Sequence, residues 1–141
     1  MTNSPPPLFD RALHRARLTR AAPGFARADF LKRRAVDDVV ERLATINRDF
    51  PTAIELGARH GLLTTALREN GRPGQVGHLM ETNLSWAMLA GSGGARVVAD
   101  EEKLPFRGGC ADLVVSTLEL HWVNDVVGAS GCHGRKVCGG R

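Results

Sequence analysis

The sequence has no apolar run that approaches the roughly 18 residues a helix needs to cross a bilayer, so it predicts no membrane span. Its start also lacks the charged segment and the apolar segment of a secretory signal. Cysteine is scarce, and the odd set of Cys110, Cys132 and Cys138 argues against a disulfide framework. These absences favour a protein of a reducing compartment.

Two nucleotide-binding signatures are also missing. The segment ELGARHG, residues 55–61, has Arg59 where a dehydrogenase-type G-x-G-x-x-G has glycine, and no Gly-Lys-Ser/Thr phosphate loop follows. The spacing of Cys132, His133 and Cys138 matches no common zinc pattern, and a fourth ligand is lacking. The sequence therefore predicts no metal site.

Positive charge, in contrast, is in excess near the N-terminus. The net charge is +4, and residues 1–34 hold eight Arg or Lys against two Asp. Such a stretch can bind nucleic acid, but no aromatic side chains are interleaved with the arginines to stack on bases. We therefore expect a solvated basic arm over residues 1–34 and no nucleic-acid partner.

The spacing of apolar residues predicts helices and strands in alternation. Residues 9–22 favour a short basic helix. Residues 27–46 favour an amphipathic helix whose apolar face consists of Val36, Val39, Val40, Leu43 and Ile46. Further strands are predicted over residues 52–56, 75–82, 95–100 and 111–118, and further helices over 62–70, 84–91 and 119–129. This alternation indicates an α/β fold with a parallel sheet covered on both faces.

Ligands bind such a sheet at the carboxyl ends of its strands. Glu55 ends the first strand, where its carboxylate can face a cationic group. Gly57 permits a tight turn against a ligand, and Gly61 permits close packing where the next helix begins. Glu81 and Asn83, at the end of the second strand, both qualify as acceptors for the hydroxyls of a ribose.

The third and fourth strands add to the same edge of the sheet. Asp100 can accept from an exocyclic amine, and Leu104 can cover a flat ring. The fourth strand brings the hydroxyl of Ser116 or Thr117 to the floor of the site. Two larger side chains, His121 and Trp122, follow the strand. Each residue also has an ordinary structural role, since the carboxylates can cap turns and the apolar side chains can belong to the core.

Four segments carry a resemblance to a known family. IELGARHG, NLSWAML, VVADEEKLPF and ADLVVSTLELHWVND resemble motifs of class I S-adenosylmethionine-dependent methyltransferases. Within that family they are similar to the malonyl-carrier-protein methyltransferases of biotin synthesis. Together with LFDRALHRAR near the start, they are also similar to the methyltransferase-like assembly factors of respiratory complex I. The likeness covers residues 8–129.

The resemblance implies a Rossmann-like sheet with the strand order 3-2-1-4-5-7-6, of which this chain supplies about four of seven strands. It implies S-adenosylmethionine as cofactor, with contacts to the methionine part from Glu55, Gly57 and Gly61, to the ribose from Asn83, and to the adenine from Asp100 and Glu101. Leu84 and Leu104 are further candidate cofactor contacts. Asn83 stands where the family usually has aspartate, and an amide binds ribose hydroxyls more weakly than a carboxylate does.

For function, the resemblance implies a methyltransferase-like protein that acts on a carrier protein or a protein side chain. The assembly-factor branch is associated with arginine hydroxylation of a partner subunit, so the reaction is left open, and no catalytic residue is assigned. The alternative is a non-enzymatic assembly factor or partner-binding fragment. The expected compartment is the cytoplasm in a bacterium and the mitochondrial matrix in a eukaryote.

The expected organisation is a basic arm over residues 1–34, a partial methyltransferase domain over 35–129 and a glycine-rich tail over 130–141. The tail has no counterpart in the resemblance, which suggests a premature end of the domain. The fourth strand would then have an unpaired edge, which would expose backbone N–H and C=O groups and lower stability.

Overall fold

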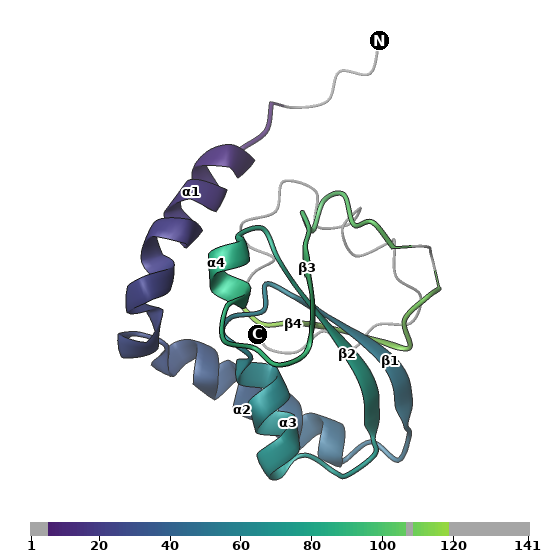
Figure 1. The fold of residues 1–141 in the computed structure, drawn as a ribbon. Coiled ribbons are helices and arrows are strands. Elements are labelled where there is room, and N and C mark those ends of the chain that lie inside the picture. The colour runs from purple at the N-terminus through teal and green to yellow at the C-terminus, as the bar shows by residue number, and fades with distance from the viewer. Residues whose placement is uncertain (1–5, 107–108, 119–141) are drawn as a thin grey trace.

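A computed structural model describes residues 6–106 and 109–118 of the 141-residue chain (Figure 1). The helix predicted over 119–129, which includes His121 and Trp122, lies outside these residues, as does the tail with its two cysteines. Within the described ranges, helices and strands alternate after an N-terminal helical segment.

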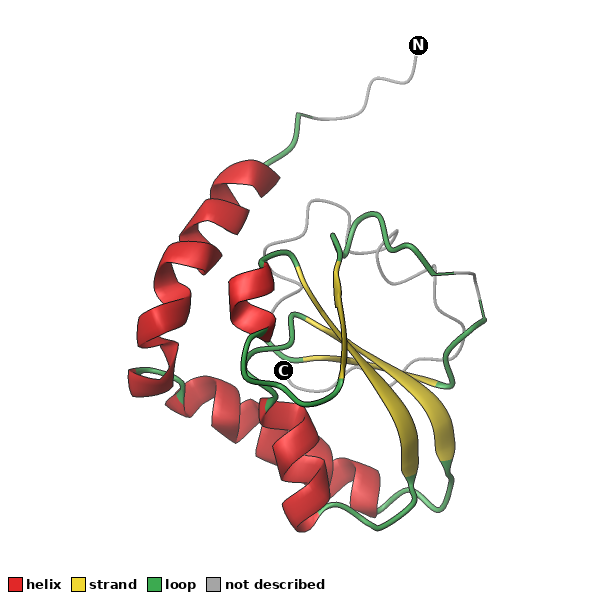
Figure 2. Cartoon of the chain, viewed as in Figure 1, coloured by secondary structure: helices red, strands yellow, loops and turns green. Residues whose placement is uncertain are grey.

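The sheet consists of β1 (Phe50–Leu56), β2 (Val76–Asn83), β3 (Ala95–Val98) and β4 (Leu113–Ser116). Each neighbouring pair is parallel, and the order across the described sheet is β3-β2-β1-β4. Figure 2 draws the strands in yellow and the helices in red. The predicted parallel α/β fold is therefore confirmed, and so is the order that the resemblance implied for its first four strands. In this order β4 lies at one end of the described sheet.

The helices are α1 (Arg11–Ala21), the 3-10 helix η1 (Ala22–Arg27), α2 (Phe30–Ala44), α3 (Leu62–Asn70) and α4 (Trp86–Leu89). Helix α1 begins after Asp10 because the Asp10 carboxylate accepts a hydrogen bond of 3.0 Å from the Leu13 N–H. These bounds confirm the helices predicted over 9–22, 27–46 and 62–70.

Helix α4 is shorter than predicted. The pattern favoured a helix over 84–91, whereas the observed helix ends at Leu89. Ala90 already has extended backbone with ψ 144°, and Gly91 adopts a left-handed φ of 84°. Because glycine takes that conformation without strain, the chain turns here towards β3 instead of continuing the helix.

The main core lies between the sheet and helices α2 and α3. Val36, Val39, Val40 and Leu43 are all buried against the sheet, and Ile46 packs at the margin, which confirms the predicted apolar face of α2. Burying each of these side chains contributes about 1.5 to 3 kcal/mol. The other face of the sheet carries a second cluster, formed by Ile54, Leu56, Ala111 and Val114.

A single buried amide holds the connection between α2 and β1. Gln75 is 2% exposed, and its Nε2 donates to the carbonyls of Leu43, Ile46 and Arg48 at 2.6, 3.0 and 3.2 Å. The last carbonyls of a helix lack partners within the helix. Gln75 therefore joins the start of β2 to the end of α2 and the loop after it, and it adds a donor to the Leu43 and Arg48 carbonyls, which also accept from the Ile46 N–H and from Arg72.

Replacing Gln75 by leucine is expected to lower the free energy of unfolding by about 2 kcal/mol, because three carbonyls each lose the hydrogen bond from this buried amide while the volume stays similar. Gln75→Glu, tested at pH 8, is expected to cost at least as much, since a carboxylate would face the same carbonyls. Urea denaturation of both variants measures this. A glutamate variant more stable than the leucine variant would contradict the assignment.

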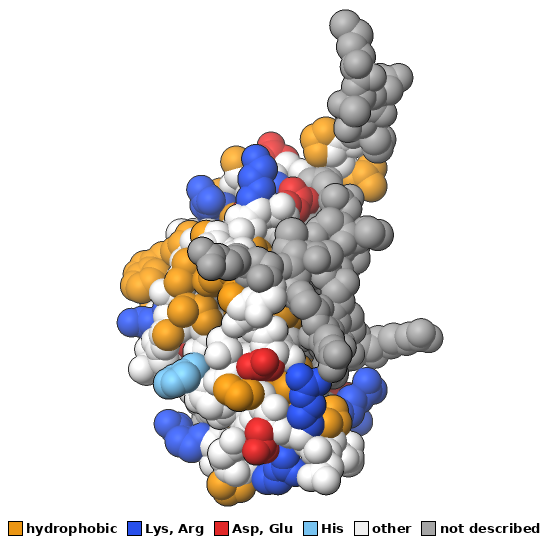
Figure 3. All heavy atoms as spheres, turned by 90° about the vertical axis from the view of Figure 1, so that its right-hand side faces the viewer, with side chains coloured by type: hydrophobic (Ala, Val, Ile, Leu, Met, Phe, Trp, Pro, Cys, Tyr) orange, Lys and Arg blue, Asp and Glu red, His pale blue; other side chains and the backbone are white. Residues whose placement is uncertain are grey.

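The surface carries mixed charge. On the face drawn in Figure 3, Lys and Arg side chains lie at separate places, several of them beside Asp or Glu. Within residues 6–106 and 109–118, no helix combines the length and the hydropathy that crossing a membrane requires. In the same ranges, no group of three or more His, Cys, Asp or Glu side chains is arranged to hold a metal ion.

Candidate cofactor-binding site

The turn between β1 and α3 lies at the carboxyl end of the sheet and has an unusual backbone. Gly57, His60 and Gly61 have left-handed φ values of 72°, 50° and 70°. The turn is joined to the end of β2, because the Ala58 N–H donates to the Thr82 carbonyl and the Asn83 Nδ2 donates to the Ala58 carbonyl, both at 2.8 Å. Gly57 and Asn83 are thus brought to the same edge of the sheet.

Arg59 does not obstruct this turn. Its guanidinium carbon lies 5.1 Å from the centroid of the Phe25 ring, in the geometry of a cation–π contact with η1. The side chain therefore runs from the turn to the N-terminal segment. An arginine at the position where the family pattern has glycine is compatible with a ligand on the turn for this reason.

Gly61 is required chiefly by packing. A Cβ added at this residue would lie 3.3 Å from three atoms of Ser92, and the left-handed φ disfavours other residues as well. The Ser92 hydroxyl in turn donates to Glu81. Gly61 therefore lets the start of α3 approach the loop before β3, and its role as a cofactor contact stays a prediction.

The two ribose candidates on β2 differ in their surroundings. Glu81 is fully buried and its carboxylate is bonded to Ser92, whereas Asn83 is the last residue of the strand. The Asn83 amide is itself engaged, since its Oδ1 accepts from the Ser85 N–H at 2.8 Å while its Nδ2 holds the glycine turn. Asn83 is therefore a structural link first, and its predicted contact with a ribose would use the remaining donor and acceptor capacity.

Glu55 is 1% exposed and lies opposite Glu81 in the β1–β2 register. Because side chains alternate along a strand, both glutamates are on the face that α2 and α3 cover, in line with Ala53 and Leu79. Two buried carboxylates are thus placed beneath the glycine turn.

Lys32 is a residue that the sequence did not single out. It is 4% exposed, and its Nζ donates to the carbonyls of Gly57 and Thr117 at 3.0 and 2.6 Å. This buried ammonium joins the ends of β1 and β4 from helix α2. The sequence did contain a signal for this residue. Lys32 lies four residues before Val36, and this spacing places it on the same apolar stripe of α2.

The acidic pair after β3 is covered by α1. The Arg11 guanidinium bonds both Asp100 oxygens, from Nη2 at 2.9 Å and from Nε at 3.4 Å, and it also pairs with Glu101. Burial alone would lower the pKa of Arg11, but the hydrogen bond to Asp100 and the charges of Glu101 and Asp100 raise it above its ordinary value. The expectation of a solvated arm is therefore wrong for this part of residues 1–34.

Leu84 and Leu104, the two apolar residues predicted to contact the cofactor, pack within the apolar clusters of the protein. Leu84 is 2% exposed and packs with Leu18, Ala22 and Met88, and its carbonyl accepts from Arg15 Nε at 3.2 Å. Leu104 packs at the margin of the second cluster of the sheet. Their roles as cofactor contacts stay predictions.

The end of β4 offers polar groups that lack partners. Ser116 and Thr117 are 8% and 1% exposed, and neither side-chain hydroxyl has a hydrogen-bond partner within the described ranges. Burying a hydroxyl without a partner costs about 1 to 3 kcal/mol. Buried hydroxyls at the carboxyl end of β4, with no partner among the described residues, fit a site that receives a polar ligand.

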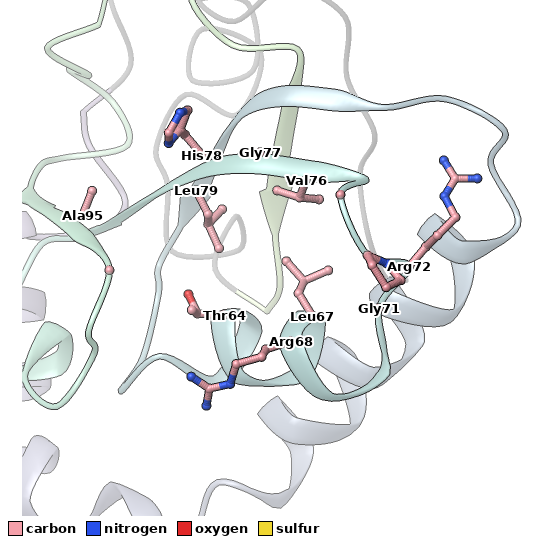
Figure 4. Close-up of a pocket in the computed structure, with 13 residues that line it drawn as sticks. Thr64, Leu67, Arg68, Gly71, Arg72, Val76, Gly77, His78, Leu79 and Ala95 are labelled. Carbon is pink, nitrogen blue, oxygen red and sulfur yellow. The ribbon is translucent and has the colours of Figure 1, made fainter.

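A cavity elsewhere in the structure does not involve these residues. It has a volume of about 540 Å³ and is lined by the end of α3, the loop after it and the starts of β2 and β3, including Leu67, Arg68, Val76 and His78 (Figure 4). It therefore lies at the amino ends of the strands. We place the candidate site at the opposite ends, because ligands of parallel sheets bind there.

Sequence comparison finds relatives with two kinds of name. A mouse (Mus musculus) protein named arginine-hydroxylase NDUFAF5, mitochondrial, is 36% identical over 126 residues, which cover 84% of this chain and 36% of that protein. Malonyl-[acyl-carrier protein] O-methyltransferase of Laribacter hongkongensis is 30% identical over 131 residues, 82% of this chain and 43% of that protein. The chain thus spans less than half the length of these two relatives.

Comparison of structures gives the same fold. A putative S-adenosyl-L-methionine-dependent methyltransferase of Methanococcus maripaludis superposes with a TM-score of 0.63 at 19% identity, over 80% of this chain and 56% of that one. A family model described as a methyltransferase domain matches residues 54–131, more than half of the chain. On this match and on the fold, the chain belongs to the methyltransferase domain family.

Proposed function

We propose that this chain binds S-adenosylmethionine at the carboxyl ends of β1, β2, β3 and β4. The observation that supports the proposal most strongly is that four features meet at one edge of the sheet: the left-handed glycine turn, Asn83, the Asp100–Glu101 pair, and the hydroxyls of Ser116 and Thr117, which have no hydrogen-bond partner among the described residues. When bound, the cofactor supplies a methyl group on a sulfonium.

Different residues of the site would contact different parts of the cofactor. The turn at Gly57 and Gly61, with the N-terminus of α3, receives the methionine part, and Glu55 supplies negative charge below it. Asn83 and Leu84 border the ribose. Asp100, Glu101 and Leu104 border the adenine, where a carboxylate accepts from the exocyclic amine.

The proposed substrate is a protein side chain or a carrier protein. The relatives named arginine-hydroxylase are 30% to 36% identical, and those named malonyl-[acyl-carrier protein] O-methyltransferase are 28% and 30% identical. The higher identity of the three mammalian relatives favours a protein side chain. Displacement at a sulfonium depends on alignment of donor and acceptor more than on an acid or base, so the proposal assigns no catalytic residue.

A non-enzymatic role is the second candidate. The buried side chains of Glu81 and Asn83 are bonded within the protein, which favours a domain that keeps its shape without a ligand. A chain of this kind would act by holding a partner protein, as an assembly factor does. The mitochondrial names of four relatives support the mitochondrial matrix as the compartment if the source is a eukaryote.

Isothermal titration calorimetry of the full chain with S-adenosylmethionine and S-adenosylhomocysteine separates the two candidates. We expect micromolar dissociation constants for both ligands. A chain that is folded by circular dichroism and binds neither ligand at millimolar concentration would rule out the first candidate and favour the second.

A further inference from the structure

Helix α1 has a contact face that is mainly polar. Arg11, Arg15 and Thr19 follow each other at intervals of four residues, and Leu18 lies beside Thr19, so the helix directs these side chains to one side. Figure 1 shows α1 next to α4, whose preceding loop belongs to the candidate site. The contacts of this face explain why an arm with eight basic residues is not simply solvated.

The C-terminal half of α1 is fixed to the loop after β2. Arg15 Nε donates to the Leu84 carbonyl at 3.2 Å, and the hydroxyls of Thr19 and Ser85 are 2.8 Å apart. Leu18 is 7% exposed and packs in one cluster with Leu84. These contacts combine polar bonds with apolar packing on the two residues that directly follow Asn83.

The N-terminal end of α1 is fixed to the loop after β3. The Arg11 side chain is 15% exposed, and its partners Asp100 and Glu101 are 24% and 5% exposed. Asp100 Oδ1 also accepts from the Glu102 N–H at 2.9 Å. The guanidinium therefore lies between two neighbouring carboxylates that are largely withdrawn from water.

We propose that α1 is a strap that holds the loops after β2 and β3 at a fixed separation, with Arg11 as the positioning residue for Asp100 and Glu101. The strap is defined as residues 11–21. It rests on the proposed function in one respect, since the two loops are those assigned to the ribose and the adenine. All of these contacts join α1 to the protein's own residues, so the strap would order the two loops whether or not a cofactor is bound.

The physical reason is electrostatic. Without Arg11, two adjacent carboxylates would remain partly buried and would repel each other, and the loop would move to rehydrate them. A loop that must be ordered again during binding weakens affinity, because the ordering free energy is then subtracted from the binding free energy. Arginine suits this position because its planar fork can bond both carboxylates at once, which a lysine ammonium cannot do as well.

The test compares the full-length chain with Arg11→Gln, Arg11→Lys and the control Arg17→Gln, whose side chain is exposed on the same helix. Two quantities are measured: the dissociation constant for S-adenosylhomocysteine, and hydrogen exchange of the amides of residues 14–21 and 100–104 without ligand. For Arg11→Gln we expect affinity to fall roughly ten- to hundredfold and exchange in both segments to accelerate about tenfold or more.

The control is expected to match the wild type in both quantities, and Arg11→Lys is expected to lie between the wild type and Arg11→Gln. If Arg11→Gln does not fold, Arg11→Lys decides the question by the same two measurements. Unchanged exchange in residues 14–21 and 100–104 would overturn the strap. Faster exchange with unchanged affinity would overturn the positioning role.

The exchange measurement also separates this inference from the proposed function. If the wild type binds no S-adenosylhomocysteine, the proposed function fails, yet the comparison of exchange between Arg11→Gln and Arg17→Gln still decides whether Arg11 holds α1 against the loop after β3. If the wild type binds and the exchange is unaffected by Arg11→Gln, the strap alone fails.

Discussion

Replacing Gly57 by valine is expected to weaken binding of S-adenosylhomocysteine at least a hundredfold. The φ of 72° at this residue is strained for a β-branched side chain, by about 1 to 3 kcal/mol. The turn cannot relax freely, because the Gly57 carbonyl is bonded to the buried Lys32. Isothermal titration calorimetry on the folded variant measures the loss.

Gly74→Val provides a matched control. Gly74 has a similar φ of 76°, and a Cβ added there would meet no atom within 4 Å. This residue lies in the loop between α3 and β2, away from the candidate site. The control should therefore lose comparable stability and keep its affinity. If both valine variants lost affinity equally, the effect at Gly57 would be one of general stability and the assignment of the turn would fail.

Asn83→Asp is expected to damage the protein although it introduces the residue that the family usually has. Asn83 is 1% exposed, and its Nδ2 donates to the Ala58 carbonyl. A carboxylate cannot donate, and it would face that carbonyl in a buried position. The free energy of unfolding should fall by about 3 kcal/mol and affinity for S-adenosylhomocysteine by tenfold or more.

Thermal unfolding and calorimetry of Asn83→Asp, beside the exposed control Asn47→Asp, measure these changes. The control should behave as the wild type. Tighter cofactor binding by Asn83→Asp would show that the ribose contact outweighs the link to Ala58, and our description of Asn83 would then be wrong.

The fold could be predicted from the sequence wherever apolar residues recur with a clear period. The stripe from Val36 to Leu43 gave α2 its buried face, and the alternation after Thr52 gave the parallel sheet. The end of α4 could not be placed, because the residues after Leu89 still read as helix until the glycines are met. Periodicity shows that a helix is present more reliably than it shows its last residue.

The candidate site was predicted in outline, since residues at strand ends converge in any parallel sheet. Two parts were missed for one reason: they consist of polar and charged side chains that bond groups elsewhere in the fold. Lys32 lies within an apolar stripe, and Arg11, Arg15 and Thr19 form a polar stripe that counts as solvated when only apolar residues are scored. The groups that these side chains bond are distant in the sequence, so no local pattern identifies those bonding partners.

A glycine in such a turn usually meets two requirements together, which are left-handed backbone and room for a ligand. At position 59 only the second requirement applies. The residues that need left-handed backbone are Gly57, His60 and Gly61, and Arg59 is not among them. Position 59 needs only a side chain that leaves space for a ligand on the turn. Arg59 leaves this space because its guanidinium lies against the Phe25 ring. A search that demands glycine at the middle of this motif would overlook such chains, whereas one that tests backbone angles position by position would retain them.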